Sequence, residues 1–168
     1  ERVSYIPADI REEKELMEKV KDFDIVYHLA GNTRTKFTDT ASLHQSINAQ
    51  GTLNLLKACS QNNVSRFIFI STCEVYGDKS REGIAEDEKK EPSNDYAKSK
   101  VLAEEYCKKY SDNIQITVIR PSYIYGYGQP EERLFPRLIK SALQDQKIEL
   151  SPNSGGYDFV YVKDVATG

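Results

Sequence analysis

The sequence predicts an α/β protein built on a doubly wound, mostly parallel sheet. Strand-like and helix-like segments alternate through the first 145 residues, which is the order that repeated strand–helix–strand units produce. Two runs, 25–29 and 66–71, are almost entirely apolar, as in strands that helices bury on both faces. Between such runs, apolar residues recur at helical spacing among charged ones. We therefore expect helices on both faces of the sheet.

Local patterns place the individual elements. Residues 3–6 are β-branched and aromatic and end at a proline, which indicates a strand. The long helix expected at 40–62 contains Gly51, which costs roughly 1 kcal/mol against alanine, so close backbone packing is expected there. Further strands are expected at 25–29, 66–71, 115–119, 148–150 and 159–162, further helices at 11–23, 96–110 and 134–143, and loops at 32–39, 78–95 and 122–133.

The helix at 96–110 has two further expected features. One of Ser93, Asn94 and Asp95 is expected to cap its first turn, because short polar side chains accept hydrogen bonds from free backbone N–H groups. Its buried stripe is expected to consist of the four residues Val101, Leu102, Tyr106 and Cys107.

The composition excludes several classes of protein. A net charge of −3 and a pI near 5.5 argue against nucleic acid or an anionic membrane as the main partner. No apolar run approaches the roughly 20 residues of a membrane span. The three cysteines have no metal-ligand spacing and are expected to be reduced thiols in a cytoplasmic protein. His28 and His44 do not form a metal motif, and His28 is expected to end a strand and bond to the backbone.

Tyr96 and Lys100 form the first candidate for chemistry. They lie at i and i+4, on one face of the expected helix. An ammonium group beside a phenol favours the phenolate, so Lys100 is expected to lower the pKa of Tyr96 and make it a proton-exchanging group. With eleven tyrosines in the chain, chance can also supply such a pair. Ligands of parallel sheets bind beyond the carboxyl ends of the strands, where the segments 8–10, 29–31, 71–77 and 121–126 are expected to meet.

These segments resemble the extended short-chain dehydrogenase/reductase family, and within it the nucleotide-sugar epimerases and dehydratases. The resemblance covers nearly the whole chain. It rests on seven motifs in the family's order: Ala8-Asp9-Ile10-Arg11, Val26-Tyr27-His28-Leu29-Ala30-Gly31, the run from Ile47-Asn48 to Leu56, Ser71-Thr72-Cys73-Glu74-Val75-Tyr76-Gly77, Tyr96-Ala97-Lys98-Ser99-Lys100, Arg120-Pro121-Ser122-Tyr123-Ile124-Tyr125-Gly126, and Phe159-Val160-Tyr161-Val162-Lys163-Asp164-Val165.

The resemblance implies a Rossmann-like fold, bound NAD, a nucleotide-sugar substrate and a homodimer. Tyr96 would be the catalytic acid/base, Lys100 would lower its pKa and hold the nicotinamide ribose, and Thr72 would bond the reacting hydroxyl. Glu74 would act on the oxidised intermediate, as in dehydratases and decarboxylases, or be a solvated carboxylate at a strand end. The implied cofactor-binding residues are Asp9, Ile10, Leu29, Ala30, Gly31, Asn48, Ser71, Tyr96, Lys100, Pro121 and Ser122.

The chain also departs from the family pattern. Cys73 stands where the 4,6-dehydratases have an aspartate, which favours a UDP-sugar 4-epimerase-like or decarboxylase-like activity. Tyr123 and Tyr157 stand where relatives have a substrate-binding Asn and an Arg. The glycine-rich turn that holds the cofactor's pyrophosphate in this family has no counterpart among the nine glycines, so these 168 residues alone are expected to bind NAD poorly.

Two hypotheses follow for function and organisation. The first is an NAD-dependent nucleotide-sugar epimerase/dehydratase, with a partial cofactor-binding domain at 1–145 that lacks the first strand–helix–strand unit, and the start of a substrate-binding region at 146–168. The second is a non-catalytic module of the same fold that serves as a scaffold or partner surface. A glycine-rich turn upstream of Glu1 in the reading frame would favour the first.

Overall fold

A computed structural model describes residues 3–33, 40–79, 83–149 and 157–168 of this chain. It divides into two compact units, Glu1–Arg120 and Pro121–Gly168, and each is described by itself. The assignment of 1–145 to a cofactor domain and 146–168 to a substrate region stays a prediction. Within the described residues, no helix is long and apolar enough to cross a membrane.

The first unit contains a parallel sheet of three strands in the order β1-β2-β3. The strands are β1 (Ile25–His28), β2 (Arg66–Ile70) and β3 (Gln115–Ile119). All three match strands expected from the sequence, and their parallel pairing confirms the predicted sheet type.

One helix precedes β1, and three others occupy the connections between the strands. They are α1 (Glu13–Lys19), α2 (Ala41–His44), α3 (Gly51–Gln61) and α4 (Asp95–Tyr110). A π-helical segment, η1 (Gln45–Gln50), joins α2 to α3, and a 3-10 turn, η2 (Cys73–Tyr76), follows β2. The helix predicted at 40–62 is therefore continuous, and the side chain of Thr40 caps its start by accepting a hydrogen bond from the Leu43 N–H.

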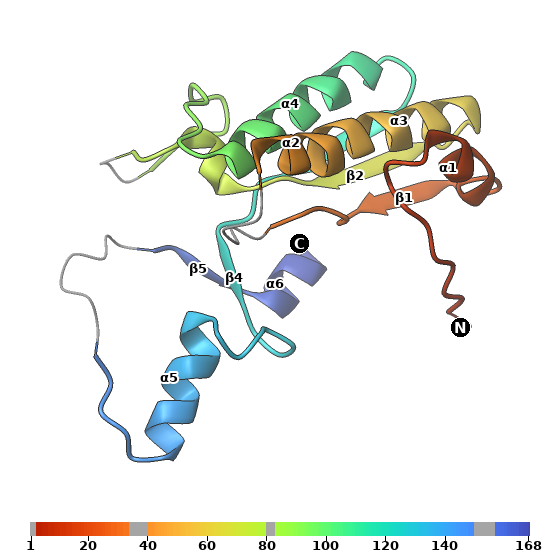
Figure 1. The fold of residues 1–168 in the computed structure, drawn as a ribbon. Coiled ribbons are helices and arrows are strands. Elements are labelled where there is room, and N and C mark those ends of the chain that lie inside the picture. The colour runs from red at the N-terminus through yellow and green to blue at the C-terminus, as the bar shows by residue number, and fades with distance from the viewer. Residues whose placement is uncertain (1–2, 34–39, 80–82, 150–156) are drawn as a thin grey trace. The chain divides into compact units, whose positions relative to one another are not determined.

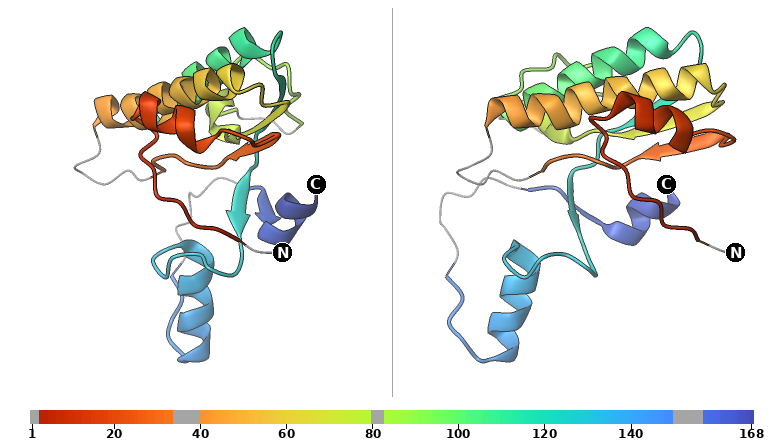
Figure 2. Two further views of the ribbon diagram at one scale, coloured as in Figure 1. Left: turned by 90° about the vertical axis from the view of Figure 1, so that its right-hand side faces the viewer. Right: turned by 45° about the vertical axis from the view of Figure 1, so that its right-hand side comes forward.

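The helices of the first unit lie over one face of its sheet (Figures 1 and 2). The prediction of helices on both faces is not met by the described residues, and neither is the prediction that β1 is buried on both sides. Ile25 and Tyr27 leave 42% and 67% of their surface exposed, whereas His28 is buried. A fully apolar run can thus form an edge strand with only one covered face.

Residues 3–6 do not form a strand, which corrects the sequence-based prediction. Val3 and Tyr5 are more than 90% exposed. The β-branched residues favour an extended backbone, but a strand also requires a neighbour for its N–H and C=O groups. Residues 3–6 pair with no strand of the described chain.

The core of the first unit lies between the helices and the covered face of the sheet. Phe67 and Phe69 of β2 are fully buried there. Gly51 at the start of α3 permits the close approach that the sequence predicted, because a Cβ at this position would lie 2.7 Å from Cγ2 of Ile10. The other buried core residues are Leu16, Val20, Leu55, Leu56, Ala58, Cys59, Val64, Ala103, Cys107 and Ile114.

His28 is a buried histidine whose tautomer follows from its neighbours. The Thr52 hydroxyl donates its one proton to the Asn48 carbonyl oxygen at 2.5 Å. His28 Nε2, 2.8 Å from Thr52 Oγ1, must therefore be the donor in that pair. The partner is a side chain and not the backbone, which corrects the expectation. Burial, and then the charge of Lys100, lower the pKa of His28 to about 3.

This histidine is expected to make the protein less stable at mildly acidic pH. Its ordinary pKa of 6.5 falls to about 3 on folding, so the unfolded chain binds the extra proton between these values. The His28 contribution is complete above about pH 6.5 and falls by up to roughly 1.4 kcal/mol per unit below it. Urea unfolding of wild type and His28→Gln at about pH 5 and about pH 7.5 measures this difference. If the difference in free energy of unfolding between wild type and His28→Gln were the same at both pH values, the predicted role of His28 would be contradicted.

The second unit contains a parallel pair of short strands, β4 (Tyr123–Tyr125) and β5 (Phe159–Tyr161). Its helices are α5 (Leu134–Leu143), as predicted, and α6 (Val162–Thr167), which the sequence analysis did not anticipate. β4 corrects the expected loop at 122–133. Residues 148 and 149 are not in a strand, and residue 150 of that predicted strand lies outside the described residues. Aromatic rings fill the space beside the strands, with Tyr125 and Phe135 stacked at 4.5 Å.

Candidate active site

Helix α4 presents Tyr96 and Lys100 toward the carboxyl end of β2. Asn94 caps the helix, because its Oδ1 accepts a hydrogen bond of 2.8 Å from the Ala97 N–H. The buried face consists mainly of small and polar residues: Ala97, Ser99, Lys100, Ala103, Glu104 and Cys107. Of the predicted apolar stripe only Cys107 is buried. Polar side chains replace the apolar ones because each finds a partner on a neighbouring element.

The side chain of Tyr96 lies beside that of Thr72, and both groups belong to the predicted catalytic set. Burial, and then the Glu74 carboxylate, raise the pKa of Tyr96 to about 12, although the Thr72 side chain acts in the opposite direction. The expectation that Lys100 lowers this pKa is therefore wrong for the structure. Tyr96 holds its proton at neutral pH, which is the form of a general acid.

Lys100 is almost completely buried and turned toward β2. Its Nζ donates a hydrogen bond of 2.6 Å to the Ile70 carbonyl oxygen and lies 4.4 Å from the centre of the Phe69 ring. Burial lowers the pKa of Lys100 to about 8. The ammonium group is thus held by the carboxyl end of β2. This contact explains why Lys100 does not lower the pKa of Tyr96, one helical turn earlier.

Glu74 is the carboxylate of the predicted catalytic set, and it is half-buried beside Tyr96. Its Oε2 accepts a hydrogen bond of 2.9 Å from Asn94 Nδ2. Its backbone N–H donates to Thr72 Oγ1 at 3.2 Å, so the side chain of Thr72 caps η2. Immediately beyond this turn Gly77 has φ of +75°, and a Cβ there would lie 2.1 Å from the Glu91 carbonyl oxygen, so the turn requires glycine.

Asn48 fastens the segment after β1 to helix α4. Its Oδ1 accepts from the Asn32 N–H at 2.7 Å, and its Nδ2 donates to the Asn32 carbonyl at 3.0 Å and to Ser99 Oγ at 2.9 Å. Ser99 in turn donates to the Tyr96 carbonyl at 2.6 Å. Asn48 lies in η1, a π-helical segment of the kind often found at functional sites. It therefore links the segment after β1 to the first turns of α4, and its role toward a cofactor stays a prediction.

The predicted cofactor-binding residues of the first unit differ in exposure: Leu29, Ala30 and Gly31 are exposed, whereas Asn48, Ser71 and Lys100 are buried. The backbone of Leu29, Ala30 and Gly31 is exposed after β1, and a Cβ on Gly31 would lie 3.1 Å from Asn48 Oδ1 and 3.9 Å from Lys100 Nζ. Asp9 forms an ion pair with Arg11, which holds the pKa of this exposed carboxyl down at about 2.

Two other predicted cofactor-binding residues are engaged within the protein. Ile10 packs against Gly51, and the hydroxyl of Ser71 donates to Glu104 at 2.5 Å. The roles of all these residues toward a cofactor stay predictions. Pro121 and Ser122 belong to the second unit, and their roles stay predictions as well.

A buried charge cluster behind the site was missed by the sequence analysis. The Glu104 carboxylate accepts two hydrogen bonds from Arg120, at 2.9 and 2.8 Å, together with one from Ser71 and an ion pair with Lys90. Arg120 also donates to the Tyr76 hydroxyl at 2.5 Å. Burial opposes the charge on Glu104, but these partners outweigh it and hold the pKa below its ordinary value. Glu104 follows Tyr96 and Lys100 by the same four-residue step, a signal that could have identified it.

His44 was considered only as a metal ligand and is in fact a neighbour of Tyr96. The two rings meet edge to face with centroids 6.0 Å apart. Its Nδ1 is buried and has no hydrogen-bond partner among the described residues. Those residues also contain no cluster of acidic, cysteine or histidine side chains that could hold a metal ion.

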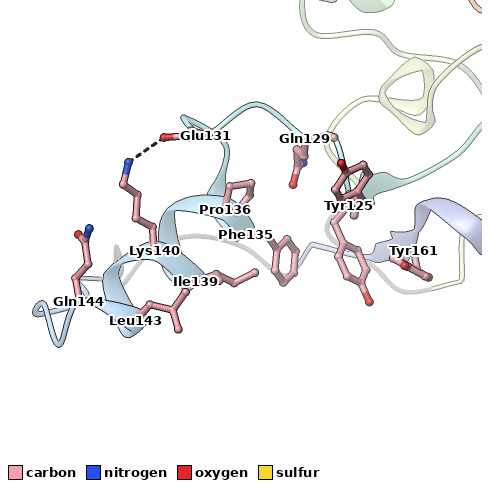
Figure 3. A pocket seen from close by; sticks show the side chains of 13 residues that line it. Tyr125, Gln129, Glu131, Phe135, Pro136, Ile139, Lys140, Leu143, Gln144 and Tyr161 are labelled. Carbon is pink, nitrogen blue, oxygen red and sulfur yellow. Dashed lines mark hydrogen bonds and ion pairs between the residues drawn. The ribbon is translucent and has the colours of Figure 1, made fainter.

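The second unit has a cavity of about 670 Å³ between the end of β4 and helix α5. Figure 3 shows Tyr125, Phe135 and Ile139 on its wall, with the ion pair of Glu131 and Lys140 to one side. Tyr125 both lines this cavity and packs against Phe135, whereas Tyr127 lines it and is fully exposed.

Comparisons with known proteins agree with this geometry. Residues 1–168 match the NAD dependent epimerase/dehydratase family. The chain is 33% identical over 155 residues to the dTDP-D-glucose 4,6-dehydratase of Mus musculus, covering 89% of this chain and 43% of that protein. Its structure is similar to that of a UDP-glucuronic acid 4-epimerase from Bacillus cereus, solved with UDP-glucuronic acid and NAD. The TM-score is 0.83 and the sequence identity is 33%, and the match covers 96% of this chain and 52% of the epimerase chain.

A second similar structure is a double mutant of a dTDP-glucose 4,6-dehydratase from Streptomyces venezuelae with NAD bound. The TM-score is 0.85 and the sequence identity is 25%, and the match covers 95% of this chain and 51% of the dehydratase chain. The chain spans about half the length of the curated relatives that it matches.

Proposed function

Because the chain belongs to the NAD-dependent epimerase/dehydratase family, we propose that the whole protein is an enzyme acting on a nucleotide sugar. In this proposal a hydroxyl of the sugar is oxidised and the hydride is later returned to the same substrate. In the oxidation the hydroxyl proton passes to Tyr96 in its phenolate form, and in the reverse step the protonated Tyr96 gives it back, while Thr72 bonds the reacting oxygen. The bound NAD supplies the chemistry of accepting and returning the hydride.

The observation that carries the proposal is that the side chains of Tyr96 and Thr72 lie beside each other at the carboxyl end of β2. A substrate hydroxyl placed between these two oxygens would have a proton donor and an acceptor within reach. Glu74 is beside them, held by Asn94, and supplies a second group that can exchange protons.

The residues around Gly31 fit the cofactor. Their backbone is exposed, and a side chain at Gly31 would crowd Asn48 and approach the ammonium of Lys100, so the glycine leaves this surface open. We propose that Leu29, Ala30 and Gly31 let the cofactor approach the backbone and that Lys100 holds its ribose hydroxyls. Asp9, Ile10, Asn48, Ser71, Pro121 and Ser122 complete the proposed cofactor-binding set.

The finer assignment is a UDP-sugar 4-epimerase-like or decarboxylase-like activity. Cys73 supports it, because a thiol is a poor acid for expelling a hydroxyl group, and the 4,6-dehydratases need such an acid at this position. A homodimer is part of the proposal.

The proposal is tested by incubating the whole protein and NAD with UDP-, dTDP-, GDP- and CDP-sugars. Conversion of one class of sugar is expected without a lasting rise in NADH absorbance, because the hydride is returned. No conversion of any sugar would contradict the proposed enzyme. One NADH accumulated per sugar consumed would contradict the return of the hydride.

A further inference from the structure

Asn94 makes two hydrogen bonds in opposite directions with the two ends of one amide group. Its Oδ1 accepts from the Ala97 N–H at 2.8 Å, and its Nδ2 donates to Glu74 Oε2 at 2.9 Å. Turning the amide over would place its NH₂ against an N–H group and its oxygen against a carboxylate. The partners therefore fix the orientation of this side chain.

These bonds close a ring of contacts around the proposed acid/base. Thr72 Oγ1 accepts from the Glu74 N–H at 3.2 Å and lies beside Tyr96. Glu74 is bonded to Asn94, and Asn94 caps the turn of α4 that carries Tyr96. An N-cap needs only the oxygen of such a side chain, so the bond to Glu74 is additional to capping.

We infer that Asn94 is a positioning residue that holds the Glu74 carboxylate beside Tyr96 while it caps helix α4. Without the Asn94 donor, the half-buried carboxylate is free to turn toward water, where ions are better solvated. The part of this inference that concerns turnover rests on the proposed function. The placement of the Glu74 charge does not rest on it and has its own readout.

That readout is the titration of Tyr96 in the whole protein, followed by NMR of tyrosine labelled with ¹³C at Cζ. Tyr96→Phe identifies the signal. Among the described residues, the other titratable groups that face Tyr96 are Cys73, His44 and Lys100, and the exposed Asp95 is paired with Lys98. None of the three groups that face Tyr96 is changed by the variants compared.

The main variant is Asn94→Ser, which keeps a capping oxygen on a side chain too short to reach Glu74. Its titration midpoint for Tyr96 is expected to fall toward that of Glu74→Gln, because the carboxylate that disfavours the phenolate is no longer held. In the Glu74→Gln background, Asn94→Ser is expected to cause no further change. Asp95→Asn, at the same helix end and exposed, is the matched control and is expected to titrate like wild type.

Turnover gives the second measurement. Asn94→Ser is expected to lower kcat on the order of 10-fold or more, since displaced catalytic groups lose their alignment, while urea unfolding stays close to wild type. A wild-type Tyr96 midpoint in Asn94→Ser or in Glu74→Gln would overturn the inference. A protein that converts no sugar but shows the expected midpoints would refute the proposed function and leave the positioning role of Asn94 supported.

Discussion

Replacing Tyr96 with phenylalanine is expected to lower the kcat of the whole protein by roughly 10²- to 10⁴-fold. This is the range that general acid–base groups contribute to enzymatic rates. The phenylalanine ring keeps the edge-to-face contact with His44 and loses only the hydroxyl beside Thr72. The expected effect is therefore on turnover and not on folding. The measurement is kcat and KM for the nucleotide sugar that the protein converts.

Tyr106→Phe provides the matched control on the same helix. Tyr106 is partly buried against the core, ten residues after Tyr96, and stands outside the proposed site. Both variants are expected to unfold within about 1 kcal/mol of wild type, and only Tyr96→Phe is expected to lose turnover. A Tyr96→Phe enzyme with wild-type kcat would remove Tyr96 from the mechanism.

Periodicity in the sequence predicted the elements that depend on local pattern. The strands β1 to β3 and the helices α3, α4 and α5 lie where the apolar runs and helical spacing placed them. The same local patterns gave wrong predictions where the formation of a strand depends on hydrogen bonding to a neighbouring strand. Residues 3–6 have the composition of a strand but no partner among the described residues, and β4, with three residues, is too short to show a period.

The candidate site was predictable in its residues and less so in its electrostatics. The spacing of Tyr96 and Lys100 identified the pair, but the sequence could not show that Lys100 turns to the Ile70 carbonyl. The rise in the pKa of Tyr96 depends on burial and on Glu74, 22 residues earlier in the chain. Such contacts between distant segments leave no local pattern. The prediction of an apolar buried stripe on α4 was wrong for the same reason, because the polar residues of its buried face bond to distant segments.

Glu104 is a buried position where substitution is expected to cost much of the protein's stability. Glu104→Ala is expected to lower the free energy of unfolding by about 3–5 kcal/mol, the range found when one partner of a buried ion pair is removed. The cost arises because Arg120 and Lys90 keep their charges and lose their acceptor, and the Ser71 hydroxyl loses its partner. Urea unfolding at neutral pH measures it.

Glu105→Ala tests whether the effect belongs to the buried carboxylate. Glu105 is the next residue of α4 and is exposed, so its removal is expected to change stability by about 0.5 kcal/mol or less. Equal losses in the two variants would contradict the role of the cluster. The pH dependence gives an independent check. The pKa of Glu104 lies below its ordinary value of 4.5 in the folded protein, so its stabilisation is present above that pH and is lost as the pH falls further.

The double variant Glu104→Met/Arg120→Met separates two contributions to the free energy of unfolding: the net stabilisation by the ion pair, and the loss that follows when only one charge of the pair is removed. Apolar replacements of similar volume often restore the stability lost when one charge of a buried pair is removed. The double variant is therefore expected to be more stable than Glu104→Ala. Arg120 also bonds the Tyr76 hydroxyl and the Glu86 carbonyl, so the segment after η2 is expected to loosen even where stability recovers. Faster hydrogen exchange at residues 83–93 in the double variant, with β2 and β3 protected, is the expected signature.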